Sequence, residues 1–311
     1  MKPHLLKVAG LPETLTKQLH EHFIVEDLGP NPDPEKLRAV APGLRAMVAN
    51  GESVVKKQLI AQLPDLKLIA VCGVGYDGVD VASARAQGAD VTHTPGVLTD
   101  EVADLAIGLL VATARQLPRA DRFVREGRWP AGPYPFTRKV SGGRLGILGL
   151  GRIGTAIARR AEAFGMEISY HNRRPRSDTQ YTYVNSLLGL AKSVDFLVVC
   201  AQGGERTRHL VNAEIIEALG PQGILINVGR GSIVDEAALA AALQAGKLLG
   251  AGLDVFEREP HVLPALVNCE NAVLTPHIGS ATATTRKAMG DLVLANLRAY
   301  FAGEPLLTPV P

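Results

Sequence analysis

The chain has 311 residues, a net charge of +2, 46% hydrophobic residues and 21% charged residues. This length favours two domains, and the composition excludes an intrinsically disordered chain. The nearly balanced charge gives no reason to expect nucleic acid as a partner, and no apolar run is long enough to span a membrane.

The three cysteines, Cys72, Cys200 and Cys269, lie in or beside apolar, strand-like runs. An odd number in such positions is most simply explained by buried, reduced thiols. The first ten residues are too short and too interrupted for a signal peptide. We therefore expect a cytoplasmic protein with no membrane partner.

The first part of the chain alternates short apolar runs with segments of helical spacing. Strands are predicted at residues 5–9, 23–28, 44–49, 66–72 and 91–93, and helices at 53–63 and 79–87. Strands that alternate with helices indicate a parallel sheet covered on both faces. A long apolar helix is predicted at 99–117, followed by a basic, proline-interrupted segment at 119–144 that predicts a helix and an extended linker.

A glycine-rich pattern, Gly149-x-Gly151-x-x-Gly154, follows an apolar run at 145–148 and opens an alanine-rich segment of helical spacing. Strand, glycine turn and helix in this order are typical of a dinucleotide-binding turn. The alternation then continues, with strands predicted at 167–171, 196–200, 224–228, 250–256 and 272–275 and helices at 236–245 and 283–301.

The loop after the second strand of this half indicates which dinucleotide is bound. An acidic residue is expected there for NAD, whereas arginine accommodates the 2′-phosphate of NADP. The loop has no carboxylate before Asp178, but it offers one amide and three guanidinium groups, from Asn172, Arg173, Arg174 and Arg176. It predicts NADP rather than NAD, although a solvated basic loop is the plainer alternative.

Three polar residues, Arg230, Glu259 and His277, stand just beyond the ends of later strands. Parallel strands place these ends at one edge of the sheet, so the three side chains can converge. Histidine is the usual proton donor near neutral pH, a carboxylate would orient it, and arginine can pair with a substrate carboxylate. Singly, they could instead be a surface ion pair and a strand-end cap.

Several ordered motifs resemble those of the D-isomer-specific 2-hydroxyacid dehydrogenases, over essentially the whole chain. They are Gly73-Val74-Gly75-Tyr76-Asp77, Asn227-Val228-Gly229-Arg230-Gly231, Gly252-Leu253-Asp254-Val255-Phe256-x-x-Glu259-Pro260 and Thr275-Pro276-His277-Ile278-Gly279. Formate dehydrogenases are similar in fold but carry glutamine at the position of Glu259. One departure is Cys200-Ala201, where the family usually has Cys-Pro.

This resemblance implies a role for each matching residue. Arg230 would bind a 2-oxo acid, His277 would be the acid–base residue with Glu259 as its partner, and Val74 and Gly75 would cradle the substrate carboxylate. Cofactor-binding positions would be Leu150, Gly151, Arg152, Ile153, Asn172, Arg173, Arg174, Val228, Arg230 and Asp254, the last at the nicotinamide carboxamide. No metal is implied.

Within the family, His171-Asn172-Arg173-Arg174 is similar to the NADP-using glyoxylate/hydroxypyruvate and hydroxyphenylpyruvate reductases. Arg128-Trp129 resembles a loop that these reductases extend across a homodimer, although simple packing of the tryptophan is the alternative. The expected fold is α/β, with two doubly wound parallel-sheet domains and an interdomain cleft. A flavodoxin-like substrate domain would span 1–97, a Rossmann nucleotide domain 98–283, and a C-terminal helix at 284–311 would return to the substrate domain.

The expected activity is NADPH-dependent reduction of a small 2-oxo acid, glyoxylate or hydroxypyruvate, to a D-2-hydroxy acid. An NAD-dependent dehydrogenase of other specificity, for example for hydroxyphenylpyruvate, is one alternative. A nucleotide-sensing binding protein, similar to the C-terminal-binding corepressors, is another.

Overall fold

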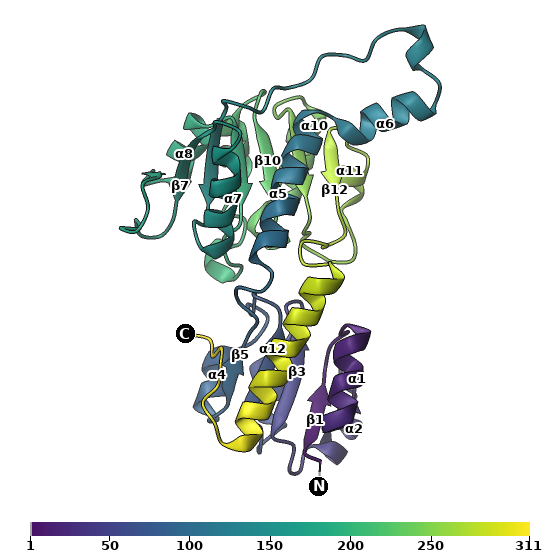
Figure 1. Cartoon of the computed structure of the whole chain (residues 1–311), viewed down its shortest axis with the longest axis vertical. Coiled ribbons are helices and arrows are strands. Elements are labelled where there is room, and N and C mark those ends of the chain that lie inside the picture. Colours follow the sequence, from purple (N-terminus) through teal and green to yellow (C-terminus); the bar gives the residue numbers. More distant parts are fainter. Residues whose placement is uncertain (1) are drawn as a thin grey trace. The chain divides into compact units, whose positions relative to one another are not determined.

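The computed structural model describes residues 2–311, which divide into two compact units. Unit 1 contains the residues up to Leu98 together with residues 281–311, and unit 2 contains residues 99–280. The chain thus begins in unit 1, builds all of unit 2 and ends in unit 1 with its last helix (Figure 1).

Unit 1 is built on a five-stranded parallel sheet in the order β2-β1-β3-β4-β5. This is the strand order of a flavodoxin-like doubly wound fold. The strands are β1 (His4–Lys7), β2 (Ile24–Asp27), β3 (Ala46–Asn50), β4 (Leu68–Cys72) and β5 (Asp90–Thr92). The helices are α1 (Glu13–His22), α2 (Pro34–Val40), α3 (Lys57–Ala61), α4 (Val81–Ala86) and α12 (Ala283–Ala302).

The middle strands of this sheet are buried because helices cover both faces. All five residues of β4 are buried, and its run Leu-Ile-Ala-Val-Cys has none of the alternation of a half-exposed strand. Helix α12 packs against β4 and α1, where Gly290 brings the two helices close at Leu15. Val310, near the C-terminus, is buried in a core cluster with Met47 of β3 and Ile69 of β4.

Unit 2 is built on a seven-stranded parallel sheet in the order β12-β11-β10-β9-β6-β7-β8. Its strands are β6 (Arg144–Leu148), β7 (Glu167–His171), β8 (Thr182–Tyr183), β9 (Phe196–Val199), β10 (Ile224–Asn227), β11 (Gly250–Leu253) and β12 (Ala272–Leu274). Its helices are α5 (Thr99–Ala114), α6 (Leu117–Arg125), α7 (Arg152–Glu162), α8 (Leu187–Ser193), α9 (Ala213–Leu219), α10 (Glu236–Gln244) and α11 (Pro264–Val267). The strand order reverses between β6 and β9, which is the switch point at which Rossmann folds bind ligands.

The predicted fold class, two doubly wound parallel-sheet units, is confirmed. The three cysteines are unpaired thiols, as predicted. Five observed helices were not predicted from the sequence: α1, α2, α8, α9 and α11. In α1, only Leu15 and Leu19 are buried, which leaves a weak apolar signal in the sequence. Among the described residues, 2–311, no helix combines the length and apolarity needed to cross a membrane.

The largest differences between predicted and observed helix ends are at the start of α3 and the end of α5. Helix α3 begins at Lys57 rather than at residue 53, because Val55 forms a β-bridge with Val79. Helix α5 ends at Ala114 rather than at 117. Gln116 takes a left-handed conformation, with φ of 51°, and Pro118 prevents an uninterrupted helix across this point. A new helix, α6, and an extended segment follow, and both project away from the sheet of unit 2 (Figure 1).

Candidate active site

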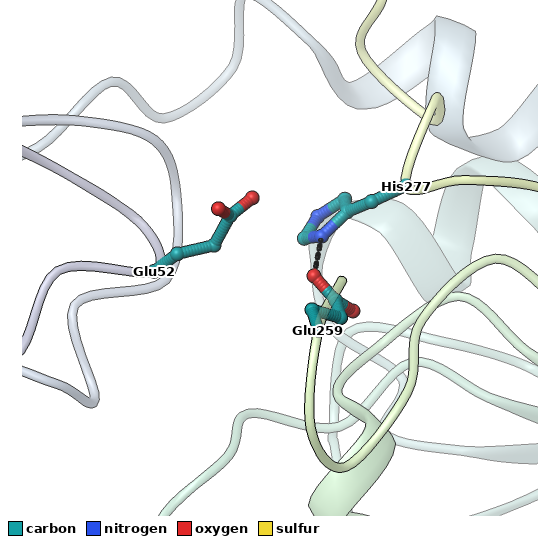
Figure 2. A group of neighbouring side chains, drawn as sticks. All are labelled: Glu52, Glu259 and His277. Carbon is teal, nitrogen blue, oxygen red and sulfur yellow. Dashed lines mark hydrogen bonds and ion pairs between the residues drawn. The ribbon is translucent and has the colours of Figure 1, made fainter. Parts of the chain in front are cut away.

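His277 lies directly after β12 in a tight turn. Its φ of 52° is left-handed, and its backbone N–H donates to the carbonyl of Asp254 at 2.9 Å. The ring is half-buried, and its Nδ1 atom lies 2.7 Å from Oε2 of Glu259 (Figure 2, dashed line). The structure therefore pairs the predicted acid–base residue with its predicted carboxylate.

Both oxygens of Glu259 are engaged. While Oε2 contacts His277, Oε1 accepts a hydrogen bond of 2.8 Å from the backbone N–H of Phe256. Burial raises the pKa of Glu259, but the bond from His277, the amide of Phe256 and the positive charge of Arg230 outweigh it, so the pKa is lowered overall. Glu259 is therefore an anion at neutral pH, fixed in orientation beside the imidazole.

Arg230 follows β10 and the turn that includes Val228. The buried Asn227 shapes this turn: its side chain accepts from the N–H of Gly229 at 3.1 Å and donates to the carbonyl of Arg230 at 3.0 Å. The Arg230 guanidinium donates to the carbonyl of Gly229 at 2.8 Å. Asn227 was not predicted as a site residue, although a polar residue ending an apolar strand was a usable signal.

Asp254 is 2% exposed and lies behind the His277 turn. Its carboxylate accepts hydrogen bonds from the hydroxyl of Thr275 at 2.7 Å and from the backbone N–H groups of Ile278 and Gly279 at 2.8 Å each. The family resemblance implied a role at the nicotinamide carboxamide. In the structure, the Asp254 carboxylate binds the Thr275 side chain before His277 and the backbone after it, so Asp254 also helps to position His277.

Glu236, the first residue of α10, supports the loop that carries Glu259. It is buried, and its Oε1 accepts from the backbone N–H of Glu257 at 2.7 Å. Burial raises its pKa, and the negative charges of Glu257 and Glu259 add to the rise. No sequence motif marked Glu236, because only the folded loop brings it to Glu257.

The glycine turn after β6 is closed on one side and open on the other. A Cβ atom on Gly149, which has φ of 100°, would lie 2.7 Å from the backbone of Ala201. A Cβ on Gly154 would lie 2.4 Å from the carbonyl oxygen of Gly149. A Cβ on Gly151 would meet nothing within 4 Å. The turn therefore fits a dinucleotide: its open side is at the N-terminus of α7, where helix N–H groups favour a pyrophosphate.

The backbone of Leu150 is bound on both sides by the loop after β7. Its N–H donates to Oδ1 of Asn172 at 2.7 Å, and its carbonyl accepts from Nη1 of Arg176 at 2.9 Å. Of the predicted pyrophosphate contacts, Leu150 and Gly151 have their N–H groups engaged within the chain, while Arg152 and Ile153 begin α7.

The basic residues after β7 have different environments. Arg173 and Arg174 are exposed beyond the end of β7. The guanidinium of Arg176, in contrast, forms its hydrogen bonds with other residues of the chain. Its Nε and Nη2 atoms form a bidentate pair with Asp178 at 2.8 and 2.5 Å.

The predicted substrate loop, with Val74 and Gly75, follows β4 in unit 1. His93 fixes it through a hydrogen bond of 2.9 Å between its Nδ1 atom and the carbonyl of Val74. The N–H of Thr94 donates to the carbonyl of Gly73 at 2.8 Å. His93 was not predicted as a site residue.

The sequence of residues 107–279 matches the family model described as D-isomer specific 2-hydroxyacid dehydrogenase, NAD binding domain. The chain belongs to the D-isomer specific 2-hydroxyacid dehydrogenase family. It is therefore an oxidoreductase of the CH–OH group that uses NAD or NADP.

Named relatives of this family align along most of the chain. It is 52% identical over 270 residues to a hydroxyphenylpyruvate reductase from Plectranthus scutellarioides, covering 87% of this chain and 86% of that one. It is 49% identical over 280 residues to glyoxylate/hydroxypyruvate reductase A from Arabidopsis thaliana, covering 89% and 90%.

A solved structure of the family aligns over 100% of this chain and 97% of its own. It is the NADPH-dependent glyoxylate/hydroxypyruvate reductase from Sinorhizobium meliloti in complex with NADP and malonate, with a TM-score of 0.92 and 46% identity. The likeness therefore extends over both units of the chain.

Proposed function

We propose that this dehydrogenase is an NADPH-dependent reductase of small 2-oxo acids, with glyoxylate or hydroxypyruvate as substrate and a D-2-hydroxy acid as product where a stereocentre forms. The observation that carries the proposal is the hydrogen-bonded pair of His277 and Glu259 beside the charge of Arg230. The similarity to reductases named for these substrates supports it.

The side chains of the site have complementary tasks in this reaction. When bound, reduced nicotinamide supplies the hydride. The guanidinium of Arg230 would pair with the substrate carboxylate and polarise the adjacent carbonyl, and Val74 and Gly75 would bind the carboxylate through their backbone. Because Nδ1 of His277 is bonded to Glu259, the proton would pass from Nε2 to the carbonyl oxygen. The carbonyl thereby becomes a CH–OH group.

The preference for NADPH rests on the loop after β7. Arg173 and Arg174 are exposed there, and the carboxylate of Asp178, which could otherwise compete with a 2′-phosphate, is paired with Arg176. Guanidinium groups suit a phosphate dianion, so Asn172, Arg173 and Arg174 would surround the 2′-phosphate.

Kinetics with a substrate panel test the proposal. Glyoxylate, hydroxypyruvate and 4-hydroxyphenylpyruvate would each be assayed with NADPH and with NADH. The highest kcat/KM is expected for a small acid with NADPH. Preference for the aromatic acid or for NADH would instead support a dehydrogenase of other specificity, and no turnover with any pair would support a nucleotide-sensing protein.

The variant His277→Asn tests the role of the histidine itself. Asparagine is chosen because it tolerates the left-handed backbone found at this position. It should lower kcat about 10²- to 10⁴-fold, the usual contribution of a general acid. Its affinity for NADPH should be unchanged. Unchanged turnover would contradict the role of His277.

We also propose that the protein is a homodimer that uses helix α6 and the segment after it. Helix α6 has no buried residue, and Trp129 and Phe136 are 64% and 106% exposed. Both side chains line a largely apolar groove, whose other lining residues are Arg115, Leu117, Ala120, Phe123, Val124, Tyr134, Pro135 and Thr137. Exposed aromatic side chains that gather on one segment favour a contact with another copy of the chain.

A further inference from the structure

Two side chains tie the glycine turn to the loop that follows β7. The side-chain oxygen of Asn172 accepts a hydrogen bond from the backbone N–H of Leu150, and the guanidinium of Arg176 donates one to the carbonyl of Leu150. Leu150 lies between Gly149 and Gly151, and its own side chain is 1% exposed. The backbone at the centre of the turn is thus fixed by residues more than twenty positions away in sequence.

The guanidinium of Arg176 is fully directed towards protein partners. Besides Leu150, its Nη1 atom donates to the hydroxyl of Thr155 on α7 at 3.0 Å. Its Nε and Nη2 atoms bind both carboxylate oxygens of Asp178. Its backbone N–H donates to the hydroxyl of the buried Tyr170 at 2.8 Å, which anchors the residue to β7. The bidentate pair with Asp178 sets the orientation in which Nη1 reaches the turn.

We propose that Arg176, oriented by Asp178, is a positioning residue that sets the glycine turn for the pyrophosphate of the dinucleotide. The inference rests on the nucleotide binding in the proposed function, but it assigns Arg176 differently from Arg173 and Arg174. The pyrophosphate is common to NAD and NADP, whereas the 2′-phosphate is present only in NADP. Loss of Arg176 should therefore weaken both dinucleotides equally.

Calorimetric titration of NADP⁺ and of NAD⁺ into the purified full chain tests this assignment. Arg176→Ala should weaken both about tenfold, the equivalent of one hydrogen bond to a charged group, and leave the ratio of the two Kd values within about twofold. Arg176→Lys, which keeps a cation but not the fork, should restore part of the affinity. The matched control, Arg174→Ala on the same loop, should weaken NADP⁺ about tenfold and leave NAD⁺ nearly unchanged.

Two results would overturn the proposal. If Arg176→Ala weakens NADP⁺ only, Arg176 contacts the 2′-phosphate. If it weakens neither dinucleotide, Arg176 has no influence on the turn. Asp178→Asn, a change at an exposed side chain, gives the same test without removing the guanidinium, and thermal unfolding of each variant shows whether the fold is retained.

Failure of the proposed cofactor preference would look different. If the unaltered protein binds NAD⁺ as tightly as NADP⁺, the preference for NADP is wrong. The titrations with NAD⁺ still decide the role of Arg176 in that case.

Discussion

The carboxylate of Asp254 accepts a hydrogen bond from the backbone of Gly279, two residues beyond the histidine of the site. The same carboxylate also binds Thr275 and Ile278, so its hydrogen bonds hold residues before and after His277. The imidazole is thus presented by a turn whose conformation depends on one buried carboxyl group.

Removing the Asp254 carboxyl group should destabilise unit 2. Asp254→Ala leaves two backbone N–H groups and one hydroxyl without their acceptor, so the free energy of unfolding should fall by about 2–4 kcal/mol. Urea denaturation measures the loss. Asp121→Asn, which removes an exposed ion pair on α6, is the control and should cost less than about 1 kcal/mol. Equal effects of the two variants would contradict the role given to Asp254.

Glu259 should make stability depend on pH in the acidic range. Its folded-state pKa is lowered from the usual 4.5, so its stabilising contribution is complete above 4.5 and is lost as the pH falls through the lowered value. The free energy of unfolding of the unaltered protein should therefore exceed that of Glu259→Gln by about 1 kcal/mol at neutral pH. This difference should shrink below pH 4.5.

Urea titrations at several pH values measure this difference. Glu214→Gln, an exposed carboxylate on α9, is the matched control and should show no such trend. A difference between Glu259→Gln and the unaltered protein that is constant across the acidic range would refute the prediction.

Two glycines of one turn should respond differently to the same substitution. Gly154→Ala places a Cβ atom 2.4 Å from the carbonyl oxygen of Gly149 and should cost about 1–3 kcal/mol of stability. Gly151→Ala meets no atom within 4 Å and should change stability by less than about 0.5 kcal/mol. It should nevertheless weaken NADP⁺ binding about tenfold, because the added methyl group occupies the open side. Thermal unfolding and calorimetry separate the two effects, and a tight-binding Gly151→Ala variant would show that the pyrophosphate lies elsewhere.

The proposed dimer depends on exposed aromatic side chains. Trp129→Asp should weaken self-association by about 2 kcal/mol, roughly thirtyfold in the dimer dissociation constant. Sedimentation over a range of concentrations would record the shift towards monomer. Val54→Asp alters a similarly exposed apolar side chain, 62% against 64%, in unit 1 and should leave the association unchanged. A monomeric unaltered protein would refute the dimer itself.

Much of the fold could be predicted because buried parallel strands leave continuous apolar runs in the sequence. The boundaries of β7 agree with the prediction at both ends. The end of α5 does not: the predicted helix ended at residue 117, directly before Pro118, but the left-handed conformation of Gln116 ends it at Ala114. Helix α1 buries too few residues to produce a clear periodicity.

The site was predictable to the extent that strand ends share one edge of a sheet. That rule brought Glu259 and His277 together correctly. It could not find Glu236 or His93, because their partners are backbone groups of other loops. Asn227 binds backbone groups of its own turn, at Gly229 and Arg230. Arg176 was grouped with its basic neighbours because a sequence shows charges but not the partners that they bind.

The return of α12 to unit 1 affects how the protein is made. The five strands of unit 1 precede unit 2 in the sequence and leave the ribosome before it, but the helix that packs on β4 and α1 follows unit 2. During translation, unit 2 can fold as soon as its own residues have emerged, whereas the earlier sheet must wait with one apolar face uncovered. The nascent chain therefore carries an incomplete unit 1 throughout the synthesis of unit 2.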